Sequence, residues 1–270
     1  MVNSNLVAKQ VKCAALFALK EELSLTPKPG LVDKVDSGSH QDLSFELMAA
    51  SAEVLGDIFQ EIALVSFDRL PSQSLREEIA EIGRRGEEYM FTVTNGINTH
   101  KGAIWALGLM SAAYASGKGN YSAREILKVA GEIASFEDSN YSEKIITNGQ
   151  SVINKHRVPG ARGEAMAGFP TIKNYGLVTY EKYEKLGCEK SDVYSFTLLS
   201  LMMHLDDTCL LHRGGKQGLE FAKEKARDIL AFEDISLLGQ MNEDFIALNL
   251  SPGGSADLLA GTIFIKKLEN

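Results

Sequence analysis

The segment spanning residues 94–108 decides how this chain folds, and it reads Thr-Asn-Gly-Ile-Asn-Thr-His-Lys-Gly-Ala-Ile-Trp-Ala-Leu-Gly. Its first half is a polar loop, and its second half is an apolar helix with regularly placed glycines. The loop carries amide, hydroxyl, imidazole and ammonium groups at Asn98, Thr99, His100 and Lys101. Because the first N–H groups of a helix lack partners within it, this junction favours an anion such as phosphate. The same pattern is also typical of an ordinary core helix that Thr99 or Asn98 caps.

The composition indicates one globular domain over residues 1–270. Hydrophobic residues make up 44% and charged residues 24% of the chain, as in folded soluble proteins. No apolar run reaches the roughly 18 residues of a membrane span, and the N-terminus lacks the pattern of a secretion signal. The three cysteines are few and scattered. We therefore expect a cytoplasmic protein without a membrane partner.

The net charge of −8 argues against nucleic acid as a ligand. Several sequence motifs with defined chemistry are also missing. The chain has no P-loop, no dinucleotide-binding glycine motif, no Cys-x-x-Cys pair and no Gly-x-Ser-x-Gly elbow. A nucleotide, if bound, is held in some other way.

Apolar residues recur at helical spacing through most of the chain, and no segment shows the alternation of a strand. Ser74 with Glu77 and Ser122 with Glu125 have the spacing of capping boxes at helix starts. The sequence predicts an all-α fold of about ten helices. The expected helices cover residues 5–25, 42–67, 74–91, 100–115, 122–136, 141–155, part of 164–174, 191–204, 217–232, 235–250 and 255 onward.

Cations lie in several of the glycine- or proline-containing loops between these helices. Rigid polar loops of this kind often carry function, and we expect them to converge on one site. In an acidic protein, cations so placed are what a polyphosphate site needs. Each residue alone could equally form a surface ion pair. The cations are Lys28, Lys34, Lys101, Arg162, Arg213 and Lys216.

The sequence predicts a magnesium site at Asp206 and Asp207, with Glu164 as a third candidate ligand. Oxygen ligands suit Mg²⁺, which usually takes one or two carboxylates together with phosphate and water oxygens. We expect the Asp pair at the C-terminal end of a helix that includes His204, where the helix dipole disfavours acidic side chains. The alternative is an N-capping or solvated Asp pair.

Five blocks of this sequence, in order, resemble the triphosphoribosyl-dephospho-CoA synthases. Residues 60–90 and 170–200 carry no such signal. The blocks are Pro27-Lys-Pro-Gly-Leu-Val-Asp33 with His40 and Asp42, Asn98-Thr-His-Lys-Gly-Ala103 with Leu107-Gly-Leu109, Gly160-Ala-Arg-Gly-Glu164, Asp207-Thr208 with Arg213-Gly-Gly215, and Ser251-Pro-Gly-Gly-Ser-Ala-Asp-Leu258.

The resemblance implies an all-α enzyme that transfers the triphosphoribosyl group of ATP to the 2′-hydroxyl of 3′-dephospho-CoA and releases adenine. The product would be the precursor of the prosthetic group of citrate lyase or of malonate decarboxylase, and the sequence does not separate the two. The resemblance further implies that an acyl-carrier-protein transferase takes up the product. A homodimer is compatible with it.

Displacement at an anomeric carbon passes through an oxocarbenium-like state, which a carboxylate stabilises while a general base assists the incoming hydroxyl. The candidate catalytic residues are Asp36, His40, Asp42, His100 and Glu164. The candidate substrate- and phosphate-binding residues are Lys28, Lys34, Asn98, Thr99, Lys101, Arg162, Arg213, Lys216, Ser251, Gly253, Gly254 and Ser255.

Two other classes of protein remain open. An all-α isoprenoid synthase would also use Mg²⁺ and acidic helix ends, but the segment Asp206-Asp-Thr-Cys-Leu210 lacks the third aspartate of its Asp-Asp-x-x-Asp motif. A non-catalytic helical interaction protein is the other alternative.

Overall fold

The computed structural model describes residues 3–139 and 148–269, and all regular structure in this part of the chain is helical. The predicted all-α class is therefore confirmed, with twelve α-helices among the described residues where about ten were expected. The elements are α1 (Ser4–Ser24), α2 (Phe45–Ser66), α3 (Gln73–Val93), α4 (Lys101–Ser116), α5 (Ala123–Ser135), α6 (Asn148–His156), α7 (Gly160–Met166), the π-helical turn η1 (Ile172–Gly176), α8 (Leu177–Lys185), α9 (Lys190–His204), α10 (Thr208–Phe232), the 3-10 turn η2 (Ile235–Leu237), α11 (Leu238–Ala247) and α12 (Gly253–Glu269).

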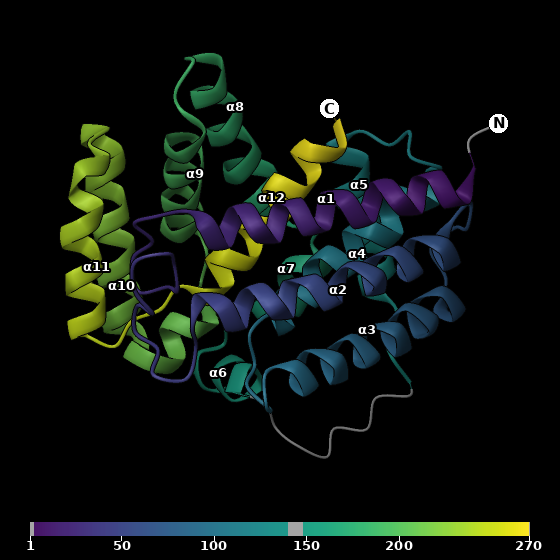
Figure 1. Ribbon diagram of the computed structural model, residues 1–270, viewed down its shortest axis with the longest axis horizontal. Helices are drawn as coiled ribbons and strands as arrows, with labels where there is room; N and C mark the ends of the chain where they lie inside the picture. The colour runs from purple at the N-terminus through teal and green to yellow at the C-terminus, as the bar shows by residue number, and fades with distance from the viewer. Residues whose placement is uncertain (1–2, 140–147, 270) are drawn as a thin grey trace.

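Helix α4 forms the centre of the fold, as the sequence of residues 94–108 predicts. Every residue from 103 to 115 is buried except Trp105. Helices α2, α5 and α12 pack around it, and α1 lies along α2 and α12 (Figure 1). A side chain at Gly108 would lie 3.3 Å from Ile62 of α2, so this glycine lets the two helices approach closely. The first and last helices of the chain thus share one core with α4.

A second group of helices, α8 to α11, stands at one end of the molecule (Figure 1). Helix α9 packs against both α8 and α10. The rings of Phe221 on α10 and Phe245 on α11 have centroids 6.2 Å apart, which joins these two helices through their side chains. Among the described residues, no helix is both long and apolar enough to cross a membrane.

The loop of residues 25–44, between α1 and α2, is fastened to this second group. The Gly30 N–H donates to Asn242 Oδ1 at 2.9 Å, and Ser39 Oγ donates to the Leu250 carbonyl at 2.6 Å. Arg213 of α10 donates to the Ser39 carbonyl at 2.9 Å. A stretch that the sequence marks only as irregular is therefore tied down by partners some 170–210 residues away in the chain.

Several helix boundaries differ from the prediction. Residues 160–163 were expected to be loop but open α7, and the glycine pair at residues 214–215 lies inside α10, which kinks at Gly215 (φ 61°, ψ −159°). Ser72, and not Ser74, caps α3 by accepting the Leu75 N–H. The capping box at Ser122 and Glu125 is confirmed. Of the helix expected at residues 141–155, the part up to residue 147 lies outside the described residues.

Candidate active site

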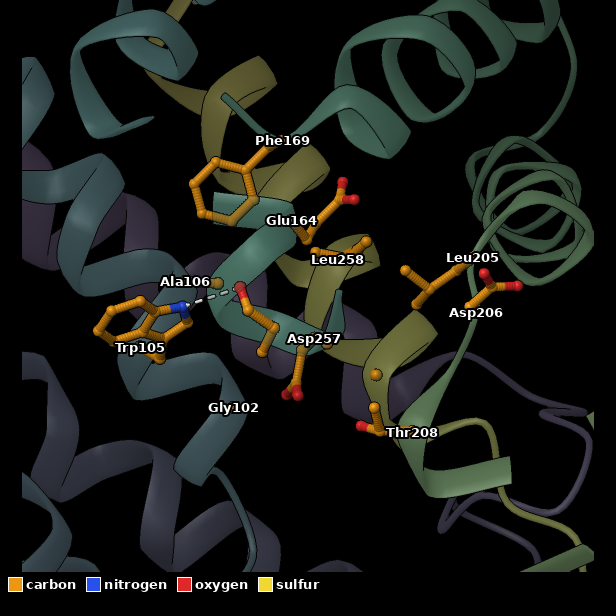
Figure 2. Close-up of a pocket in the computed structure, with 13 residues that line it drawn as sticks. Gly102, Trp105, Ala106, Glu164, Phe169, Leu205, Asp206, Thr208, Asp257 and Leu258 are labelled. Carbon is orange, nitrogen blue, oxygen red and sulfur yellow. Dashed lines mark hydrogen bonds between the residues drawn. The ribbon is translucent and has the colours of Figure 1, made fainter. Parts of the chain in front are cut away.

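A pocket opens where the first turns of α4, α7, α10 and α12 meet (Figure 2). It encloses about 430 Å³ of space, including the open solvent at its mouth. Trp105, Phe169, Leu205 and Leu258 supply most of its apolar wall. The full lining is Gly102, Trp105, Ala106, Gly160, Ala161, Glu164, Phe169, Leu205, Asp206, Thr208, Gly254, Asp257 and Leu258.

Glu164 is the one predicted catalytic residue that lines this pocket. Its Oε1 accepts the Thr171 N–H at 2.8 Å, which fixes the side chain on α7. Burial raises the pKa of this carboxyl, and the Thr171 hydrogen bonds offset part of the rise. A carboxyl with a raised pKa is a stronger base when ionised than an ordinary glutamate, which suits acid–base chemistry.

Asp257 is a second carboxyl in the pocket, and the sequence analysis did not select it. It belongs to α12 and lies against the first turn of α4, where it accepts the Ala103 N–H. A side chain at Gly102 would put its Cβ only 1.9 Å from Asp257 Oδ2, so glycine is needed at this contact. Burial raises the pKa of Asp257 well above its ordinary value, and the nearby Glu22 and Asp207 raise it further. Asp257 lies within the block of residues 251–258 that resembles the synthase family, and this membership could have identified it as a candidate.

Trp105 and Phe169, which shape the pocket, were also missed as site residues. The Trp105 indole N–H donates to the Ala161 carbonyl at 3.2 Å and so ties α4 to α7 (Figure 2). Phe169 is buried. Apolar residues at helical spacing give no sign in the sequence that they face a cavity and not the core.

Asp207 is buried, and hydrogen-bond donors surround its carboxylate. Oδ1 accepts the N–H groups of Cys209, Leu210 and Gly254, and Oδ2 accepts the N–H and hydroxyl of Ser255 at 2.8 and 2.9 Å. It is the N-cap of α10, so the expectation that it ends a helix is wrong, and the N-capping alternative is correct. The dipole of α10 favours a carboxylate at this position.

The three predicted magnesium ligands do not form a ligand set here. Asp207 has no oxygen free of N–H or O–H donors, exposed Asp206 pairs with Lys223 at 2.6 Å, and Glu164 accepts from Thr171. The described residues contain no group of three or more His, Cys, Asp or Glu placed to hold a metal ion.

The predicted phosphate-binding cations have very different surroundings. Lys28 is buried and paired with Glu22 at 2.6 Å, and Lys101 is paired with Glu87 at 2.8 Å. Arg213 fastens the loop of residues 25–44. Arg162 is exposed on α7, next to Ala161 of the pocket, and forms no ion pair with other described residues. The two remaining cations, Lys34 and Lys216, are exposed.

His40 belongs to a hydrogen-bonded cluster beside the pocket. Its Nε2 lies 2.8 Å from the hydroxyl of the buried Ser251, and its Nδ1 accepts from Arg213 at 3.1 Å. Burial and, after it, the positive charge of Arg213 lower the pKa of His40 to about 4, against the opposing effect of Asp42. The exposed Asp42 lies 3.9 Å from Nδ1. His40 is therefore neutral near pH 7 and serves to join the loop to the start of α12.

The hydroxyl of Ser51 on α2 contacts both Thr99 and His100. Ser51 Oγ lies 2.6 Å from Thr99 Oγ1 and 2.8 Å from His100 Nδ1. Burial, followed by the nearby charge of Lys28, lowers the pKa of His100 to about 4. Asn98 Oδ1 accepts the Lys101 N–H, the first of α4, at 3.1 Å, while His100 occupies the N-cap position.

The other predicted residues fall into the same two regions. Asp36 accepts from the Gly38 N–H and from Asn242 within the fastened loop. Gly253 packs against Cys209, and the hydroxyl of Ser255 donates to Asp207. Gly254 lines the pocket. The structure thus brings Glu164, Asp206 and Gly254 to the pocket, and it places most of the other candidates in the contacts that assemble its rim.

Comparison with known proteins agrees with the resemblance of the five blocks. The chain is 39% identical to a probable 2-(5''-triphosphoribosyl)-3'-dephosphocoenzyme-A synthase of Azotobacter vinelandii, over 97% of this chain and 92% of that protein. It is 38% identical to the 2-(5''-triphosphoribosyl)-3'-dephosphocoenzyme-A synthase of Klebsiella pneumoniae, over 94% of this chain and 92% of that protein. No solved structure matches the chain. Residues 8–270 match the family described as CitG: ATP:dephospho-CoA triphosphoribosyl transferase, and the chain belongs to that family.

Proposed function

We propose that this protein transfers the triphosphoribosyl group of ATP to the 2′-hydroxyl of 3′-dephospho-CoA and releases adenine. The family assignment supports this activity. The observation that carries it within the molecule is the pocket itself, where carboxyl groups with raised pKa values lie among apolar walls at several helix starts. Groups suited to acid–base chemistry are thereby concentrated in one site.

Glu164 acts as the general base in this proposal. The bond between ribose C1′ and adenine N9 breaks with its electron pair on the base, and the 2′-oxygen of dephospho-CoA bonds to C1′. Glu164 receives the proton of that hydroxyl as the new bond forms. Its raised pKa suits a group that must accept this proton and then release it to water. The apolar wall limits access of water, which would otherwise compete with the 2′-hydroxyl.

The triphosphate remains intact during this reaction, so the protein has only to hold it. Arg162 is the cation we assign to this task, because it lies beside the pocket and its planar fork can grip two phosphate oxygens. Mg²⁺ is proposed to accompany ATP, held by phosphate and water oxygens. The buried Asp207 carboxylate is not assigned to it.

The wider setting follows from the same proposal. The product is the precursor of the prosthetic group of citrate lyase or malonate decarboxylase, and an acyl-carrier-protein transferase consumes it. The protein is proposed to work in the cytoplasm, and a homodimer is one form in which it could act.

The test is an assay of adenine by chromatography, with ATP and dephospho-CoA supplied together and singly, with and without Mg²⁺. We expect one adenine per dephospho-CoA consumed, and only with both substrates present. Arg162→Ala should raise the KM for ATP roughly 10- to 150-fold, the equivalent of about 1.5–3 kcal/mol for a charge-assisted contact. The matched control is Arg85→Ala, which removes an arginine of α3 that pairs with Glu61 of α2. This variant should leave the KM for ATP unchanged.

Two results would contradict the proposal. Adenine release at the same rate without dephospho-CoA would indicate a nucleosidase. Release of diphosphate without adenine would instead indicate that the reaction takes place at the phosphate groups of ATP.

A further inference from the structure

The carboxyl group of Asp257 lies at the inner side of the pocket, against the first turn of α4 (Figure 2). The Ala103 N–H donates to it, and Oδ2 occupies the space that a side chain at Gly102 would need. Only a residue without a side chain at position 102 lets the carboxyl reach this place. The group is therefore fixed from two sides, by its own helix α12 and by α4.

The charges that face Asp257 are mostly negative. Glu22 approaches from α1 and Asp207 from the start of α10, and both raise the pKa of Asp257, after burial itself. Glu22 is neutralised by its buried ion pair with Lys28. His100, at the start of α4, is neutral near pH 7 because its pKa is about 4. The other titratable residues of the lining are Glu164 and Asp206, so no cation among the described lining residues favours ionisation of Asp257.

A carboxyl in such surroundings keeps its proton near neutral pH and can act as a hydrogen-bond donor and acid. The proposed reaction needs an acid, because adenine leaves ribose far more readily when a ring nitrogen is protonated as the bond to C1′ breaks. Glu164 cannot serve this need at the same time, since it must be ionised to accept the proton of the 2′-hydroxyl. The two carboxyls of the pocket thus fit two different tasks.

We propose that Asp257 is the catalytic acid of the transfer, which protonates a ring nitrogen of the departing adenine, and that Gly102 is the positioning residue that lets it reach the base. The inference rests on the proposed function. As the C1′–N9 bond breaks, its electron pair moves to adenine and the Asp257 proton moves to the purine ring. The 2′-oxygen bonds to C1′ and its proton passes to Glu164. Transfer of that proton through water back to Asp257 restores both groups, so the cycle uses no further reactant.

The first test compares Asp257→Asn, which is nearly isosteric, with the wild type. General acid catalysis contributes about 10²- to 10⁴-fold, so kcat should fall at least about 100-fold while the Kd for ATP, by calorimetry, stays within threefold. The wild-type kcat should decline at alkaline pH as Asp257 loses its proton, and this limb should be absent in the variant. A variant that keeps the alkaline limb and a kcat within threefold of wild type would overturn the inference.

The second test changes the leaving group. In an ATP analogue that carries 8-azaadenine, the base is more acidic and departs with less need of a proton. The deficit of Asp257→Asn should shrink at least about tenfold with this analogue. An equal deficit with both leaving groups would show that Asp257 does not protonate the base and acts only through structure.

The third test replaces none of the proposed catalytic residues. Gly102→Ala should displace the Asp257 carboxyl from α4 and lower kcat at least about tenfold, without loss of ATP binding. Gly83→Ala is the matched control, because a Cβ there meets nothing closer than 3.9 Å on a helix of similar length, and it should leave kcat unchanged. Wild-type kcat in Gly102→Ala would contradict the positioning role, and this variant also serves if Asp257→Asn fails to fold.

The failure of this inference can be told from failure of the proposed function. Wild-type protein that releases no adenine from ATP and dephospho-CoA would overturn both. Wild-type protein that does so, with an Asp257→Asn variant of equal kcat, would overturn the role of Asp257 alone.

Discussion

Asp207 illustrates how one carboxylate can look catalytic in a sequence and act structurally in the fold. Its five donors come from the first turns of α10 and of α12, so a single side chain caps two helices whose starts are 45 residues apart in the chain. Burial raises the pKa of Asp207, and these hydrogen bonds oppose the rise. The aspartate therefore fixes Gly254 and Ser255 against α10, close to the pocket.

Replacing Asp207 by Asn should destabilise the protein. The amide group would place N–H donors opposite backbone N–H donors and leave at least one of them buried without an acceptor, at a cost of about 1–3 kcal/mol. Urea unfolding followed by circular dichroism measures this loss. Asp206→Asn is the neighbouring control, and it should cost under about 1 kcal/mol because its pair with Lys223 is partly exposed. Equal stability of the two variants would contradict the double-cap role.

The candidate residues themselves could be predicted from sequence only in part. Residue type and loop context identified Glu164 and Gly254, which do line the pocket. Neither property reveals that Lys101 has Glu87 as a partner or that Arg213 holds the Ser39 carbonyl. Partners this distant in the chain meet only through the tertiary fold. For the same reason Asp257 gave no local sign that a glycine of another helix makes room for it.

At the level of single helices, α10 contains one residue with an unusual backbone conformation. Gly215 has φ 61° and ψ −159°, in a region that only glycine occupies without strain, and the two halves of α10 meet there. The kink falls two residues after Arg213, whose guanidinium fastens the loop of residues 25–44. The bend in α10 and the attachment of that loop are thus adjacent features of one segment.

Gly215→Ala should cost about 1–3 kcal/mol of stability, because alanine at this backbone conformation is strained. A glycine in an ordinary helix should respond in the opposite sense. Gly239→Ala in α11, where a Cβ meets nothing within 4 Å, should stabilise the protein by up to about 1 kcal/mol. Thermal unfolding by calorimetry compares the two. A stabilised Gly215→Ala variant would mean that α10 straightens without penalty.

Helix boundaries show why local signals succeed or fail. The capping box at Ser122 and Glu125 was found because both partners lie within four residues. Residues 160–163 have the sequence pattern of a loop because glycine and proline are unfavourable in helices, yet packing of α7 against α5 makes this segment helical. Tertiary contacts outweigh local propensity in so short a helix.

For the whole molecule, the partly buried His40 and the buried His100 make stability depend on pH. The folded-state pKa values of His40 and His100 are about 4, below the ordinary value of 6.5. Between these values the unfolded chain binds protons that the folded chain does not. Stability contributed by the neutral histidines is therefore fully present above about pH 6.5 and is lost as the pH falls towards 4.

His100→Asn should flatten this dependence. Between about pH 4 and pH 6.5, the variant's free energy of unfolding should change by up to about 1.4 kcal/mol less per pH unit than that of the wild type. Urea unfolding at pH 7, 6 and 5 gives the two slopes, and the difference between slopes is independent of any fixed loss of stability. Parallel slopes would mean that His100 titrates in the folded protein as it does in the unfolded chain.

The fold class could be predicted from the sequence because helical periodicity repeats over the entire chain and no segment competes with it. The convergence of loops on one site was right for the segments at Gly160 and Gly254, which reach the pocket. The loop of residues 25–44 contributes instead to the attachment of α10 and α11. Periodicity specifies which face of a helix is buried, but it does not specify which helix ends meet.

The place of α12 has a consequence for how the protein is made. Helix α12 packs against α1 and α4 and carries Gly254 and Asp257 into the pocket, yet it follows all the other described helices in the sequence. During synthesis on the ribosome, α1 emerges before α12 and must wait for this partner until residues 253–269 have been translated. A nascent chain that stops before Gly253 has most of its helices but no complete pocket. Activity therefore requires that α12 has been translated and has packed against α1 and α4.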